Sequence, residues 1–216
     1  MTCVLVHGGG STARFWDRLG PLLDGPVLAV DLPGRGSHPA DLARISVDDE
    51  VASVVADIHG ARIGDPIVLV AHSSGGLVVP GVVAALGGLV HRVVLNAALV
   101  PPEGGCGLDC MQDRHRDGLA AAVQAAPSDA PITLPGPPAD VDRSRTAYGG
   151  EPLGDDDVAF VTDPVRFVAD TVHHYFQPVH WSVVMDVPIT YVLNERDRPV
   201  PPDTQELMAG RLPGPV

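Results

Sequence analysis

Residues 67–76 read Ile-Val-Leu-Val-Ala-His-Ser-Ser-Gly-Gly, and this stretch decides the fold. Ile67 to Ala71 is an apolar run with the length and β-branched content of a buried strand. The stretch from Gly75 to Leu86 is rich in small residues and reads as a helix. Ser73 therefore sits where a strand turns sharply into a helix.

A turn of this kind prepares a serine for nucleophilic chemistry. It exposes the hydroxyl above the edge of the sheet and aims the first backbone N–H groups of the helix at the developing negative charge. The residues two before and two after the serine must be small, and Ala71 and Gly75 are. The pattern small-x-Ser-x-Gly also occurs in ordinary glycine-rich turns, but its place between strand and helix predicts that Ser73 is a nucleophile.

Outward from this turn, short β-branched runs alternate with helical patterns. The alternation predicts an α/β fold, a mostly parallel sheet with flanking helices. The runs expected as strands are 3–6, 27–30, 67–71, 92–95 and 188–193, and the segments expected as helices are 15–23, 46–58, 75–86, 160–176 and 203–210. The second helix should begin at a capping box of Ser46 and Asp49.

The alternation stops between about residues 101 and 186. We therefore expect a core made of residues 1–100 and 187–216, with residues 101–186 inserted as a cap. The insertion holds a proline-rich stretch, 127–138. It also carries six of the nine aromatic residues, which could wall a pocket but are expected mostly to form the core of the insertion: Tyr148, Phe160, Phe167, Tyr175, Phe176 and Trp181.

The composition excludes several classes of function. A net charge of −13 argues against nucleic acid as a partner, because nucleic-acid affinity needs clustered cations. All 14 basic residues are arginine, which excludes Schiff-base lysine chemistry within these residues. The three cysteines cannot pair fully, and Cys106 and Cys110 lack zinc-site spacing. We expect no metal, no organic cofactor and no membrane partner. The first residues do not have the pattern of a secretory signal, which favours a cytoplasmic location.

Two further groups complete the expected chemistry. The loop after the first strand, His7-Gly8-Gly9-Gly10, should supply an oxyanion donor, and the backbone of Gly9 is the candidate. Asp197 follows the last recognisable strand and could orient a base, with Glu195 as a competitor. The alternative is that Asp197 pairs with a neighbouring arginine on a solvated loop. The strand before the insertion ends in Asn96, so no carboxylate competes from there.

These motifs together resemble the α/β-hydrolase superfamily, in particular the plant methylesterase and hydroxynitrile lyase group and related bacterial esterases. The resemblance rests on residues 4–23, 31–36, 71–76, 99–104 and 191–202. It implies Ser73 as nucleophile, Asp197 as the acid of the triad, and Gly9 and Ser74 as the oxyanion N–H donors. Hydroxynitrile lyases of this group carry threonine where this chain has Gly8, and the glycine favours ester hydrolysis.

The resemblance also implies a histidine after Asp197, and all nine histidines precede that residue. Three explanations compete. The favoured one is that a further segment beyond Val216 supplies the base. Alternatively, a histidine of the insertion substitutes, the candidates being His173, His174 and His180, which we expect instead to be surface or packing residues. Finally, the protein could be a binder without activity. His72 is expected to pack or orient rather than act as base.

The sequence thus predicts a serine hydrolase that cleaves a small carboxylic ester, lactone or thioester through an acyl-enzyme. A ligand-binding pseudoenzyme, or a lyase or cyclase on the same fold, is the alternative. The expected partner is a small-molecule substrate. For the oligomeric state, a monomer and a homodimer are both compatible with the sequence.

Overall fold

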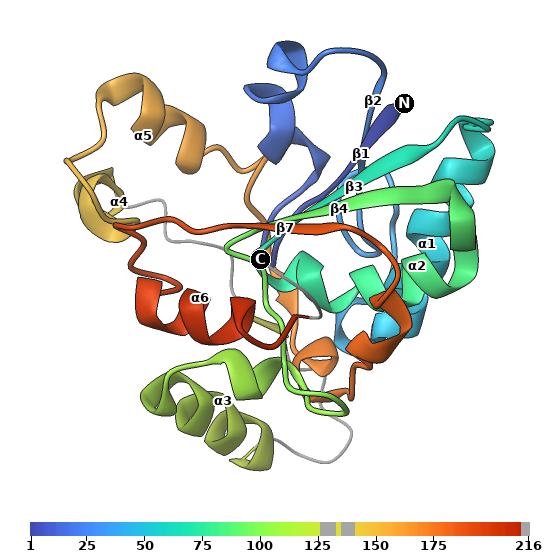
Figure 1. The fold of residues 1–216 in the computed structure, drawn as a ribbon. Coiled ribbons are helices and arrows are strands. Elements are labelled where there is room, and N and C mark those ends of the chain that lie inside the picture. Colours follow the sequence, from blue (N-terminus) through green and yellow to red (C-terminus); the bar gives the residue numbers. More distant parts are fainter. Residues whose placement is uncertain (126–132, 135–140, 213–216) are drawn as a thin grey trace.

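The centre of the protein is a five-stranded parallel sheet. The computed structural model describes residues 1–125, 133–134 and 141–212 (Figure 1). The strands are β1 (Thr2–Val6), β2 (Val27–Val30), β3 (Ile67–His72), β4 (Val90–Asn96) and β7 (Ile189–Val192). They are hydrogen-bonded in the order β2-β1-β3-β4-β7, every neighbouring pair parallel. Each strand expected from the sequence is present, and the predicted fold class is confirmed.

Helix α1 (Val47–Gly60) connects β2 to β3, α2 (Val79–Leu86) connects β3 to β4, and the two helices pack against each other. The capping box at the start of α1 is confirmed: the Ser46 hydroxyl accepts from the Asp49 backbone, and Asp49 accepts from the Ser46 backbone. The buried face of α1 includes Val54, as expected, and also the carboxylate of Glu50, which the apolar pattern did not reveal.

Two helix predictions in the first 90 residues need correction. Residues 15–23 form two short 3-10 helices, Ala13–Asp17 and Gly20–Leu22, instead of one α-helix, because Gly20 and Pro21 interrupt the helical spacing. The helix expected over residues 75–86 is also divided. It starts as a 3-10 helix at Ser73–Leu77 and becomes α2 only at Val79, next to Pro80.

Two later predictions also differ from the structure. Residues 160–176 are not one helix: α5 (Asp155–Val161) ends before Pro164, and the short strand β6 (Asp170–Thr171) and a 3-10 turn (His173–Phe176) follow. The last helix, expected over residues 203–210, is α6 (Pro202–Ala209); it begins after Pro201 and has no side-chain cap.

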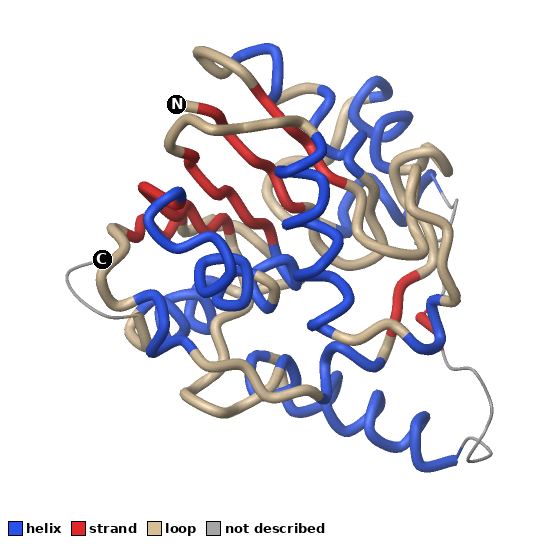
Figure 2. Tube along the Cα trace, turned by 90° about the vertical axis from the view of Figure 1, so that its right-hand side faces the viewer, coloured by secondary structure: helices blue, strands red, loops and turns tan. Residues whose placement is uncertain are grey.

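The segment between β4 and β7 lies mostly away from the sheet. Its remaining elements are the 3-10 turn Gly107–Cys110, α3 (Asp113–Ala125), β5 (Thr133–Leu134), α4 (Val141–Ala147) and the 3-10 turn Trp181–Val184. In Figure 1, α3, α4 and α5 stand apart from the strands, whereas α1 and α2 lie close to them; Figure 2 shows the same strands side by side from a second direction. Most of the proline-rich stretch, 127–138, lies outside the described residues.

The core is aliphatic and centred on the inner strands. Val4, Leu69 and Val93, from β1, β3 and β4, have no exposed surface. None of the helices in the described ranges is long and apolar enough to cross a bilayer.

Candidate active site

Ser73 adopts the strained backbone expected of an exposed nucleophile. β3 ends at His72, and Ser73 follows with φ of +51°, a left-handed conformation that is unfavourable for a residue with a side chain. Its carbonyl accepts a hydrogen bond from the Leu99 backbone (2.8 Å), which ties the turn to the chain that leaves β4. The predicted sharp turn between strand and helix is present.

The glycines after Ser73 allow neighbouring backbone to approach. A Cβ atom on Gly75 would lie 2.6 Å from the His7 carbonyl oxygen, which belongs to the loop after β1. A Cβ on Gly76 would meet the Leu99 carbonyl at even shorter range. Gly75 is therefore required because the turn rests directly on the first-strand loop.

We expect the Gly75→Ala substitution to destabilise the protein by about 1–3 kcal/mol, because two backbone segments must separate to admit the methyl group. The free energy of unfolding from urea titration measures the effect. The matched control is Gly60→Ala: Gly60 ends α1 and a Cβ there would meet nothing within 4 Å. The control should be neutral or stabilising by roughly 0.5–1 kcal/mol. Equal stability of the two variants would contradict the close approach at Gly75.

The loop after β1 is held in place by a buried neutral histidine. The His7 Nδ1–H donates to the Gly8 carbonyl (2.8 Å), and Nε2 accepts from the Leu32 backbone N–H (3.1 Å). Burial lowers the pKa of His7 to about 4, so the ring is neutral at pH 7 and this tautomer is the one that satisfies both contacts.

The same loop contacts the serine turn. A Cβ on Gly8 would lie 2.7 Å from Ser73 Cβ, and one on Gly9 would lie 3.1 Å from the Ser74 Oγ. Glycine at both positions thus lets the loop backbone approach the nucleophile. The structure brings together three of the expected residues, Ser73, Gly9 and Ser74.

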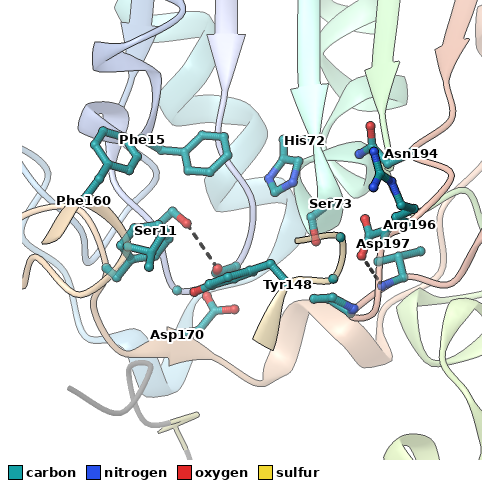
Figure 3. A pocket seen from close by; sticks show the side chains of 18 of the residues that line it. Ser11, Phe15, His72, Ser73, Tyr148, Phe160, Asp170, Asn194, Arg196 and Asp197 are labelled. Carbon is teal, nitrogen blue, oxygen red and sulfur yellow. Dashed lines mark hydrogen bonds between the residues drawn. The ribbon is translucent and has the colours of Figure 1, made fainter. Parts of the chain in front are cut away.

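Asp197 faces the cavity that Ser73 faces, at the loop after β7 (Figure 3). Its Oδ1 accepts from the Val200 backbone (2.9 Å), and partial burial raises the pKa of its carboxyl. The ion pairs of the described residues do not include one between Asp197 and a neighbouring arginine; Arg198 instead donates to the Thr146 carbonyl (2.8 Å). Glu195 is exposed.

The position at the end of β4 is occupied by a neutral pair. Asn194 Nδ2 donates to Asn96 Oδ1 (3.1 Å), bridging the ends of β7 and β4. We expected no catalytic acid at the end of β4 because Asn96 stands there, and this contact between two uncharged amides agrees with that expectation.

Two cavities meet at Ser73. The larger, about 950 Å³, reaches from the Gly9 loop to Asp197, and the smaller, about 530 Å³, lies beside α3. Both are lined by Ser73 and Tyr175. Four aromatic residues of the β4–β7 segment line the larger cavity, which corrects the expectation that most of them form a separate core: Tyr148, Phe160, Phe167 and Tyr175. Phe160 and Phe167 also contact each other edge to face.

The histidines near Ser73 are not those proposed as substitutes from the insertion. His174 is buried against Glu50, His180 is exposed and contacts Glu103 (3.1 Å), and His173 is exposed. His72 lines the larger cavity, where its ring stacks on Phe15 with centroids 4.7 Å apart.

The expectation that His72 packs agrees with this stacking, and burial lowers the pKa of its imidazole to about 4. His115, on α3, lines the smaller cavity, and its sequence position gave no reason to expect it beside Ser73.

The sequence profile of the Alpha/beta hydrolase family matches residues 3–216. The chain belongs to this family. Membership of this family supports the conclusion that the protein is a hydrolase. A search of curated proteins finds no sequence match.

Solved structures share the fold at low identity. An extracellular alpha/beta-hydrolase from a Paenibacillus species, described as sharing homology with tobacco salicylic acid binding protein 2, is 21% identical with a TM-score of 0.76; the match covers 99% of this chain and 88% of that one. A pyrethroid hydrolase from Sphingobium faniae is 21% identical with a TM-score of 0.75, over 100% and 86% of the two chains. A methylesterase from Arabidopsis is 18% identical with a TM-score of 0.70, over 99% and 86%. The resemblance to plant methylesterases and bacterial hydrolases is confirmed at the level of the fold.

Proposed function

We propose that this hydrolase cleaves a small carboxylic ester, lactone or thioester through an acyl-enzyme on Ser73. The observation that carries the proposal is the left-handed backbone of Ser73, at the end of a central strand and at the junction of two cavities. A serine forced into this conformation holds its hydroxyl out of the sheet. The two cavities offer room on both sides of a carbonyl group attached to that hydroxyl.

In the proposed reaction the Ser73 hydroxyl attacks the carbonyl carbon, and a base accepts its proton. The negative charge on the carbonyl oxygen is stabilised by the backbone N–H groups of Gly9 and Ser74. Collapse of this intermediate breaks the bond to the alcohol or thiol, which leaves with the proton, and water then hydrolyses the ester on Ser73.

We propose that the proton acceptor is an imidazole oriented by Asp197. The histidine expected after Asp197 would take this role. His72 and His115 are its competitors, because each lines a cavity together with Ser73. The low pKa of His72 makes it a weak base, and His115 lies in the cavity that Asp197 does not line.

We expect a fluorophosphonate probe to label the full-length protein, because the probe reacts with activated serines and leaves inert ones unmodified. Labelling should decrease when a nitrophenyl ester competes for the site. We expect the His115→Gln variant to be labelled at the wild-type rate, because His115 is not the proposed base. Loss of labelling in this variant would make His115 the base. A folded wild-type protein that the probe does not label would favour the ligand-binding alternative.

A further inference from the structure

Four ionisable side chains that the proposed reaction does not use are buried together behind the Gly9 loop. Arg35, Glu50, Asp170 and His174 are each 3% exposed or less. They come from three separate parts of the chain: the loop after β2, helix α1, and the β6 region of the β4–β7 segment.

The four groups form one connected network. Arg35 donates through Nη1 to Glu50 (3.1 Å) and through Nη2 to Asp170. The His174 ring contacts Glu50 through Nδ1 (3.0 Å) and lies 4.0 Å from Asp170 through Nε2. With His174 protonated, two cations balance two anions.

The protonation states favour this balance. Burial alone would lower the pKa of His174, but the Glu50 carboxylate raises it above its usual value. Burial alone would raise the pKa of Asp170, yet the charges of His174 and Arg35 keep it low. The Asp170 carboxylate therefore stays ionised within the protein.

Stability is a weak explanation for such a network. Replacing buried ion pairs by apolar side chains of similar size is often neutral or stabilising, because burial of charge carries a large desolvation penalty. A buried carboxylate that contacts functional backbone suggests a role in positioning.

Asp170 touches the loop that carries the proposed oxyanion donor. A Cβ on Gly9 would collide with its Oδ2, and the nearby Gly10 backbone N–H helps to keep the pKa of its carboxyl low. The Tyr175 hydroxyl donates to the same Oδ2 (3.2 Å) and would lie 2.6 Å from that Cβ. Figure 3 shows Asp170 at the Ser11 end of the cavity, away from Asp197.

We propose that Asp170 is a positioning residue for the oxyanion hole: its carboxylate fixes the Gly9–Gly10 backbone and the Tyr175 hydroxyl against the Ser73 turn, and Arg35 keeps that carboxylate in place. The inference rests on the proposed function of Ser73. In this proposal the contact between Asp170, in the β4–β7 segment, and the Gly9–Gly10 backbone, in the loop after β1, contributes to catalysis. Fixed donors are effective because they need no reorganisation when charge develops on the carbonyl oxygen.

The test is steady-state hydrolysis of a nitrophenyl ester by the full-length protein and its Asp170→Asn variant. We expect kcat to fall by about 10- to 100-fold with KM changed by less than about threefold, because a small displacement of donors affects the transition state more than ground-state binding. The matched control is Asp57→Asn, a half-buried carboxylate of α1 that contacts His38 (3.0 Å). Its kcat should stay at the wild-type level.

A double variant separates positioning from simple stabilisation. Arg35→Gln with Asp170→Asn removes one charge of each sign, so the free energy of unfolding should recover relative to Asp170→Asn alone. If Asp170 positions the loop, kcat stays low in the double variant. Recovery of kcat together with stability would overturn the proposal.

Tyr175→Phe covers the case in which Asp170→Asn does not fold, because it removes only the hydrogen bond to Asp170. We expect kcat about 3- to 10-fold lower at unchanged KM; an unchanged kcat would overturn the proposal.

A wild-type protein without hydrolysis would instead refute the proposed function. An active wild type with a fully active Asp170→Asn variant would refute the positioning role alone.

Discussion

Replacing Ser73 with alanine should lower kcat for ester hydrolysis by about 10³-fold or more, because the acyl-enzyme can no longer form. KM should change little, since the cavities keep their shape. Steady-state kinetics with nitrophenyl acetate measures the effect, and thermal unfolding checks that the variant is folded.

Ser74→Ala is the matched comparison for this prediction. It also removes one hydroxyl, but it retains the backbone N–H that we propose as an oxyanion donor. The loss in kcat should be smaller than about tenfold. A Ser73→Ala variant that hydrolyses the ester at the wild-type rate would contradict the acyl-enzyme and favour a reaction in which the serine forms no covalent bond.

Asp197→Asn should lower kcat by roughly 10²- to 10⁴-fold, because an amide in place of the carboxylate holds the base in the wrong tautomer and does not stabilise its protonated form. The Val200 backbone can still donate to the amide oxygen, so the loop should keep its conformation. The measurement is kcat/KM across pH, with unfolding as the check on structure.

Glu195→Gln is the control for Asp197→Asn, because it removes an exposed carboxylate two residues away. Its solvated charge should contribute little, and we expect kcat/KM within about threefold of the wild type. If the two variants lost activity in reverse order, Glu195 would be the acid, and the assignment of Asp197 would be wrong.

The parallel sheet and the serine turn could be predicted from local sequence. β-branched runs such as Ile67–Ala71 mark buried strands on their own, and the small residues after Ser73 indicate a tight turn. The capping box at Ser46 is equally local. These features depend on residues only a few positions apart, which is why they were visible.

The network behind the Gly9 loop could not be predicted in this way. Arg35 and Asp170 are 135 positions apart, and Glu50 lies on a helix whose other buried residues are apolar. One signal was present: a glutamate within the apolar stripe of α1 is a charge that needs a partner. Glu50 has two partners: Arg35, from the loop after β2, and His174, whose position depends on how the β4–β7 segment packs.

The helical reading of residues 160–176 failed for a related reason. The spacing of Phe160 and Phe167 suits one helical face, but the two rings meet because the chain turns after Val161. Two features fix that turn: Pro164, and the hydrogen bond that the Val168 backbone N–H donates to the Gly10 carbonyl (2.8 Å). The aromatic residues consequently line the cavity beside Ser73.

The most direct test of the account is to locate the fluorophosphonate adduct by peptide mass spectrometry. The account predicts one adduct, on Ser73, that is absent from the Ser73→Ala variant and persists in Ser74→Ala. An adduct on any other serine, or none in a folded sample that hydrolyses the ester, would contradict it.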